Sequence, residues 1–154
     1  MKYIDTSAFV KWYGKEPFEK GAGVIVTLMQ KVCTGEVTLI SSFLMVGEAI
    51  STFDKWLRIK VITVEEFNSL VSRFVTDIKE LSENGFLFLE TVNPAVIMSA
   101  VDYIIKYHIP VNDAMHLHSA VVWQHDIDEF ICSDRLLKTA AQKEGLAVSD
   151  PEDL

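Results

Sequence analysis

The sequence lacks any apolar stretch near the length needed to cross a bilayer, and its first residues, MKYIDTSAF, become acidic too early for a signal peptide. It has two cysteines, Cys33 and Cys132, and neither belongs to a C-x-x-C pair. These absences predict a soluble cytoplasmic protein with reduced, buried thiols. Internal repeats, low-complexity segments and linkers are also missing, so we expect one domain over residues 1–154.

Several well-known catalytic motifs are missing as well. The chain contains no G-x-S-x-G, no P-loop and no G-x-G-x-x-G. Positive charge is scarce, because 14 Lys and Arg stand against 22 Asp and Glu and the formal net charge is -8. Simple nucleic-acid binders depend on Lys and Arg to neutralise phosphates. Any nucleic-acid function must therefore come from a specific site or from a basic partner.

Hydrophobic residues make up 49% of the chain, which is enough for a substantial core. Short apolar segments alternate with longer segments of helical periodicity. This alternation predicts an α/β fold, a three-layer α/β/α sandwich with a central parallel sheet of four to five strands. The predicted strands are 2–5, 37–42, 86–91, 129–133 and 146–150, and we expect 86–91 to be buried. The predicted helices are 6–13, 18–36, 41–59, 63–85, 93–108, 112–123 and 134–145.

Individual residues predict where several helices begin. Thr63 and Glu66 have the spacing of a capping box. Asn93 before Pro94 is a favourable cap and first-turn pair. Ser42 and Asn112 are the predicted N-caps of the helices that follow them.

Acidic residues follow the predicted strands or begin the helices next to them. Ligands of open parallel sheets bind outside the carboxyl ends of the strands. Four carboxylates from separate segments are therefore expected to converge on one edge of the sheet: Asp5, Glu48, Asp113 and Asp134. Taken singly, each has a simpler explanation, a helix cap or a favourable helix dipole for the aspartates and a solvated helix flank for the glutamate.

Taken together, the four acids are harder to explain as caps and surface charges. Clustered carboxylates repel and raise each other's pKa unless a cation lies between them. Mg²⁺ and Mn²⁺ prefer carboxylate and water oxygens. The usual chemistry of such a site is phosphoryl transfer, in which one or two ions activate water and stabilise the leaving oxygen.

The segments YIDTSAF, GEAI, NDAMHLHSA and CSDRLLKTAAQKEGL resemble, in order and spacing, the four acidic motifs of PIN-domain ribonucleases, in particular the VapC-type toxins of toxin–antitoxin pairs. The resemblance covers essentially the whole chain. It implies an endoribonuclease that depends on one or two Mg²⁺ or Mn²⁺ ions and uses water to attack a backbone phosphate. Asp5, Glu48 and Asp113 would bind the principal ion, and Asp134 would bind a second ion or position the water. A homodimer and a small basic or DNA-binding antitoxin are also implied.

Hydroxyl groups next to these acids are secondary site candidates. Thr6 and Ser7 are candidates to hydrogen-bond a carboxylate or a phosphate. Ser133 occupies the small hydroxyl position that, by the resemblance, precedes the last acid, and its simpler role is an N-cap.

Basic residues near the acids are candidates for RNA contacts. Arg135 and Lys138 share one helical face beside Asp134 and are the better candidates for phosphate contacts. Lys11 and Lys15 are weaker candidates, and we expect Lys15 to be simply solvated. His116 follows Asp113 by three residues on the same helix face, so it is a candidate to touch substrate or to orient an acid. A histidine packed or hydrogen-bonded in the core is the more common case, and we expect that one here.

Two other classes of function remain open. A catalytically silent PIN-fold binding or regulatory module would keep the fold without cleaving RNA. A receiver-like or phosphatase-like Mg-binding domain fits less well. A receiver needs an acceptor Asp after the third strand, where Glu90 and Thr91 stand, and a haloacid-dehalogenase phosphatase needs an acid where Ser7 stands.

Overall fold

The computed structural model describes residues 1–14 and 19–153, so Lys15 and the predicted helix start at Phe18 lie outside the described residues. Its centre is a five-stranded sheet in the order β3-β2-β1-β4-β5. Every neighbouring pair of strands is parallel, as the alternating pattern predicted. The strands are β1 (Lys2–Ile4), β2 (Leu39–Ser42), β3 (Leu87–Glu90), β4 (Glu129–Ile131) and β5 (Val148–Ser149).

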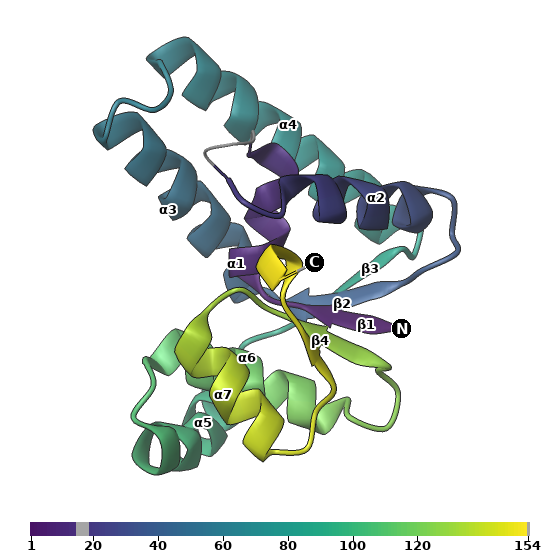
Figure 1. Ribbon diagram of the computed structural model, residues 1–154, viewed down its shortest axis with the longest axis vertical. Coiled ribbons are helices and arrows are strands. Elements are labelled where there is room, and N and C mark those ends of the chain that lie inside the picture. The colour runs from purple at the N-terminus through teal and green to yellow at the C-terminus, as the bar shows by residue number, and fades with distance from the viewer. Residues whose placement is uncertain (15–18, 154) are drawn as a thin grey trace.

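Helices cover both faces of the sheet, which gives three layers (Figure 1). One face carries α1 (Thr6–Phe9), the 3-10 helix η1 (Val10–Tyr13), α2 (Ala22–Cys33), α3 (Leu44–Arg58) and α4 (Val64–Glu83). The other carries α5 (Pro94–Tyr107), α6 (Val111–Val122) and α7 (Arg135–Lys143), and the chain closes with η2 (Pro151–Asp153). Within residues 1–14 and 19–153, no helix is long and apolar enough to span a bilayer.

Alternating side chains along the strands divide the core in two. Successive residues of a strand point to opposite faces. Ile4 and Leu39 therefore pack among the helices α1 to α4, whereas Tyr3, Ile40 and Phe130 pack against α5, α6 and α7. Strand register reinforces this division, because Tyr3 pairs with Ile40 on one side and with Phe130 on the other.

Strand β3 differs from the prediction that it is buried. Leu87 is buried, but Leu89 and Glu90 are only partly enclosed and Phe88 is 53% exposed. The reason is its place in the sheet, because β3 is an edge strand with a neighbour on one side only. An apolar composition such as FLFLET does not distinguish a central strand from an edge strand.

Three of the four predicted helix starts have the expected capping side chain, and one is wrong. Thr63 and Glu66 form the capping box of α4, and the Asn93 side chain caps α5 ahead of Pro94. Ser42 still belongs to β2, but its hydroxyl accepts from the backbone N–H of Leu44 at 3.3 Å and so caps α3 from one residue before Phe43. Asn112 is not the cap of α6, because this helix starts at Val111, directly after Pro110.

Both cysteines are free thiols, as predicted, and they differ in burial. Cys132 is buried directly after β4. Cys33 is exposed, so the expectation that both are buried is wrong for this residue. It is the last residue of α2, whose buried stripe consists of Ala22, Ile25, Met29 and Val32.

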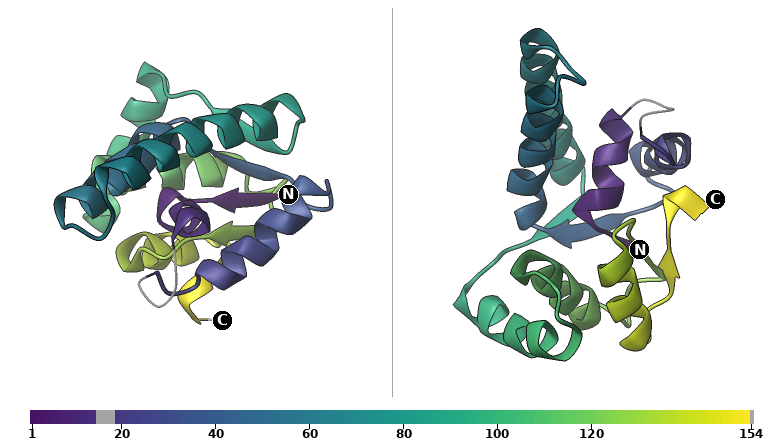
Figure 2. Two further views of the ribbon diagram at one scale, coloured as in Figure 1. Left: turned by 90° about the horizontal axis from the view of Figure 1, so that it is seen from above. Right: turned by 60° about the vertical axis from the view of Figure 1, so that its left-hand side comes forward.

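The direction in which the chain crosses the sheet reverses between β1 and β4. After β1 and β2 the chain crosses one face, and after β3 and β4 it crosses the other (Figures 1 and 2). The adjacent strands β1 and β4 therefore lead in opposite directions from their carboxyl ends. Such a switch point is where open α/β sheets hold ligands.

Candidate active site

Asp5 follows β1 directly at the switch point and is 4% exposed. Its backbone N–H donates to the carbonyl of Ile131 at 2.9 Å, which ties it to the end of β4. Its Oδ2 caps α1, because it accepts from the backbone N–H of Ser7 at 2.9 Å and from the Ser7 hydroxyl at 2.5 Å. Its Oδ1 lies 3.7 Å from Nε2 of His116. The cap thus engages one oxygen of Asp5 and turns the other toward α6.

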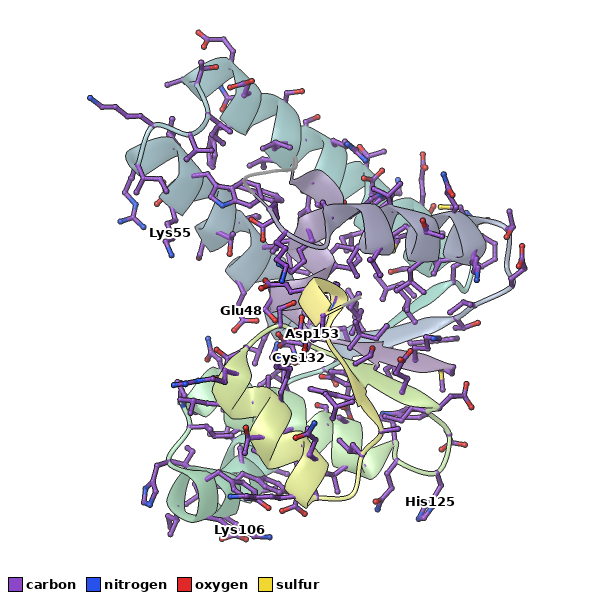
Figure 3. The ribbon with its side chains drawn as sticks, in the orientation of Figure 1. Glu48, Lys55, Lys106, His125, Cys132 and Asp153 are labelled. Atoms are coloured by element: carbon purple, nitrogen blue, oxygen red, sulfur yellow. The ribbon has the colours of Figure 1, made fainter. Side chains whose placement is uncertain are left out.

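Glu48 comes from the second turn of α3 and meets the same histidine (Figure 3). Its Oε2 accepts from the Thr6 hydroxyl at 2.5 Å and lies 2.9 Å from Nε2 of His116. Burial by itself would raise the pKa of Glu48. The hydrogen bond and the charge of His116, together with hydrogen bonds from Thr6 and Asn112, outweigh burial and lower this pKa below its usual value.

Asp113 lies in the first turn of α6, where a helix cap was its simplest explanation. Its side chain makes no capping hydrogen bond. Burial, and then the negative charges of Asp5, Asp134 and Glu48, raise its pKa to about 7. A residue kept for stability would not be placed where three other carboxylates repel it. Capping therefore does not explain Asp113.

Asp134 follows β4 and does act as a helix cap. Its Oδ1 accepts from the backbone N–H of Leu137 at 2.8 Å, at the start of α7. The structure thus confirms that Asp134 is a helix cap, which was the simpler explanation for this residue. It also lies close enough to Asp113 for its charge to raise the pKa of that residue.

The structure brings the four predicted acids to one edge of the sheet, and their oxygen atoms are a donor set that fits a hard divalent cation. Among residues 1–14 and 19–153, no three His, Cys, Asp or Glu side chains already stand in the arrangement of a metal-ligand group. Oε2 of Glu48 and Oδ2 of Asp5 are held by protein donors. Metal binding would therefore involve movement of side chains, and the ligand assignment stays a prediction.

The three candidate hydroxyls hydrogen-bond to carboxylates. Thr6 donates to Glu48 and Ser7 donates to Asp5. Ser133 donates its hydroxyl to Oδ1 of Asp150 at 3.0 Å, and its backbone N–H donates to Oγ of Ser7 at 3.0 Å. Ser133 is not an N-cap, because Asp134 occupies that position. These hydroxyls fix the shape of the acidic cluster.

The basic side chains that are candidates for RNA contacts differ in whether they are exposed and already paired with acids. Arg135 is exposed at the start of α7 and makes no ion pair with the described residues. Lys138, in contrast, is paired with Asp150 and lies 3.7 Å from Asp153. Lys11 is 2% exposed and forms ion pairs with two glutamates, at 2.9 Å to Glu19 and at 2.6 Å to Glu152.

Two residues of the site go beyond the main sequence prediction. His116 is fully buried, as expected, and it also lies between Asp5 and Glu48, where it meets the alternative that it orients an acid. Its spacing of three from Asp113, on one helix face, was the available signal. Asp150, which holds Ser133 and Lys138, was overlooked. It follows β5 directly, so the rule that identified Asp5 and Asp134 applies to it too.

No family model matches the chain, and no curated protein matches it. Solved structures do share its architecture. FitAB bound to the IR36 DNA fragment is similar with a TM-score of 0.64 and 18% identity, over 100% of this chain and 97% of that chain. FitAcB from Neisseria gonorrhoeae is similar with a TM-score of 0.63 and 19% identity, over 100% of both chains. At these identities the likeness shows the fold, which is the predicted three-layer PIN-like architecture.

Proposed function

We propose that this chain is a divalent-metal-dependent endoribonuclease that hydrolyses RNA phosphodiester bonds, and that it is the toxin component of a toxin–antitoxin pair. The observation that carries the proposal is the state of Asp113. Burial, and then the charges of three carboxylates from three other segments, raise its pKa to about 7 at the switch point of the sheet. A cation among these acids would relieve the repulsion, and an acidic cation site at such a point suits phosphoryl transfer.

We assign different roles to the four acids at this site. Asp5, Glu48 and Asp113 would hold the principal Mg²⁺ or Mn²⁺ ion, and Asp134 would hold a second ion or position the water. When bound, the ion would activate water and stabilise the leaving oxygen of the phosphodiester. Thr6 and Ser7 hold the carboxylates of Glu48 and Asp5 in place for this chemistry. Exposed Arg135, beside Asp134, is the best placed side chain to contact RNA phosphate.

Partners are the second part of the proposal. The chain carries a net charge of -8, and a basic partner complements such a charge. FitAB, which shares the fold, is bound to DNA in its solved structure, and a DNA-binding antitoxin is what the sequence resemblance implies. An apolar surface also remains on α5, where Met98 is 69% and Ile105 is 67% exposed. Exposed apolar side chains of this kind are compatible with a homodimer.

Cleavage of a mixed RNA pool by the purified protein tests the enzymatic proposal. We expect cutting with Mn²⁺, no cutting with EDTA, and no cutting by the Asp113→Asn variant. The matched control is Asp126→Asn, which removes an exposed carboxylate from the loop between α6 and β4 and should leave cleavage unchanged. A short reading frame directly upstream, whose product inhibits cleavage when added, would support the toxin assignment.

Other results would favour the alternatives. Mn²⁺ binding without cleavage of any RNA would favour a silent binding or regulatory module. Turnover of a phosphomonoester, or transfer of a phosphoryl group to an aspartate, would favour the phosphatase-like or receiver-like class. Equal cleavage by the natural protein and by Asp113→Asn would contradict the role proposed for Asp113.

A further inference from the structure

His116 is the buried histidine around which the candidate site is arranged. It lies in α6 and its side chain is 1% exposed. Its Nε2 faces three oxygen atoms from two other parts of the chain: Glu48 Oε2 at 2.9 Å, and Thr6 Oγ1 at 3.4 Å and Asp5 Oδ1 at 3.7 Å from neighbouring residues. The ring therefore lies where α1, α3 and α6 meet over the end of β1.

Tyr3 faces the other ring nitrogen of His116, where a donated hydrogen bond favours the proton on Nε2. Its hydroxyl lies 3.0 Å from Nδ1 of His116, and both side chains are fully buried. A neutral imidazole carries one N–H and one acceptor nitrogen. When the Tyr3 hydroxyl donates to Nδ1, the single N–H is on Nε2 and points to Glu48. When the ring carries both protons, Nε2 still donates to Glu48, so the direction of this bond is the same in both states.

The contact between His116 and Glu48 restricts the orientation of the Glu48 carboxylate. This side chain comes from α3, on the opposite side of the sheet from α6, and it is 23% exposed. Thr6 and His116 both donate to Oε2, and two donors fix a carboxylate more strictly than one. Without the imidazole donor, Glu48 would be held through Thr6 alone and could turn further toward solvent.

A satisfied core histidine is the simpler interpretation of His116. Such a residue stabilises the fold, and its loss would lower stability without a separate effect on the acids. His116 differs from such a residue, because its Nε2 contacts one predicted metal ligand, Glu48, and lies beside another, Asp5. Groups that hydrogen-bond to metal ligands orient them, and their removal commonly weakens metal binding.

We propose that His116 is a positioning residue, which, with its tautomer set by Tyr3, holds Glu48 over the switch point so that it faces Asp5 and Asp113. This inference rests on the proposed metal-dependent function. It adds two residues, His116 and Tyr3, to a site otherwise composed of carboxylates and hydroxyls. Neither residue is assigned to touch RNA or the ion.

Mn²⁺ titration by calorimetry on the full-length protein, with metal-free melting temperatures measured alongside, tests the inference. His116→Leu removes the donor and should weaken Mn²⁺ binding by roughly 10- to 100-fold. His116→Gln can place an amide N–H near the position of Nε2 and should restore most of the affinity. Tyr3→Phe keeps the imidazole of His116 but removes the hydroxyl that faces its Nδ1, so we expect a smaller loss of Mn²⁺ affinity. His118→Leu, in the same helix and away from the acids, is the matched control.

The outcomes separate this inference from the proposed function. If the natural protein does not bind Mn²⁺, the metal-dependent function is wrong and the role of His116 is wrong with it. If the natural protein binds Mn²⁺ and His116→Leu binds it equally well, the positioning role alone is overturned. Should His116→Leu fail to fold, His116→Gln and Tyr3→Phe decide. Affinity kept by the first and reduced by the second supports positioning, and equal affinity in both contradicts it.

Discussion

The hydroxyl of Thr6 donates to Oε2 of Glu48 across 2.5 Å, joining residues 42 positions apart. Thr6 is 7% exposed at the first turn after β1, and Glu48 extends from α3. This bond connects the segment that carries Asp5 to the helix that carries Glu48. It makes the geometry of the acidic cluster dependent on a side chain that carries no charge.

Replacing Thr6 with Val keeps the shape of this side chain and removes the donor. Because a partly buried carboxylate then loses a hydrogen bond, we expect a loss of about 1–3 kcal/mol in the free energy of unfolding. Urea denaturation in EDTA measures this loss. Thr6→Ser keeps the hydroxyl and is the control. Equal stability of Thr6→Val and the natural protein would show that the bond contributes little.

Asp113→Asn should stabilise the metal-free protein, and more so at higher pH. The pKa of Asp113 is about 7 in the folded protein, against 3.8 as its ordinary value. The folded state therefore binds this proton more tightly than the unfolded chain, and stability falls as pH rises from about 4 to about 7. The amide of the Asp113→Asn variant does not titrate in this range, so the stability of the variant does not fall with pH for this reason. Melting temperatures in EDTA should favour the variant more at about pH 8 than at about pH 5. A large loss of stability in the variant would instead make Asp113 a structural residue.

The same carboxyl makes metal binding pH-dependent. A cation that binds Asp113 must displace its proton while the pH lies below about 7. Mn²⁺ affinity should therefore rise up to about pH 7 and then level, and binding at about pH 6 should release close to one proton. Calorimetry in two buffers of different ionisation enthalpy measures this release. Proton release that persists unchanged in Asp113→Asn would assign the effect to another group.

Arg135 and Lys138 should differ in their effect on RNA cleavage. Arg135 is exposed, whereas Asp150 and Asp153 already neutralise Lys138. If the enzyme cleaves RNA as proposed, Arg135→Ala should raise KM and reduce the salt dependence of binding by about one phosphate contact. Lys138→Ala should change KM less and stability more. Cleavage rates at several salt concentrations distinguish the two, and the reverse order would contradict the assignment.

Lys11 should contribute to stability through its buried charge. Because its ammonium neutralises Glu19 and Glu152, Lys11→Met leaves two acids without their partner. A fully buried pair costs about 3–5 kcal/mol to break in this way, and the partial exposure of the two glutamates lowers our expectation to about 1–3 kcal/mol. Lys20→Met, at an exposed position, is the control. Urea denaturation of both variants checks the difference, and equal losses would contradict it.

Much of the fold was predictable because its signals are local. Thr63 and Glu66 form their capping box within one turn, and apolar segments such as 2–4 and 129–131 lie between helical segments of clear periodicity. One error arose where a neighbour in space decides, because Phe88 is exposed on a strand that has a neighbour on one side only. Another error is local, because α6 begins at Val111, directly after Pro110, so Asn112 already lies inside the helix.

The sequence by itself determined the types of chemical group and their approximate place. Acids directly after strands, in a chain whose strands are parallel, must gather at one edge of the sheet. Tertiary structure alone decided which groups touch. His116 and Glu48 are 68 positions apart, and Ser133 meets Asp150 only because β4 and β5 are neighbours. Packing in three dimensions sets such contacts, and it is also what gives Asp113 its raised pKa, since desolvation and repulsion depend on distances that no local pattern encodes.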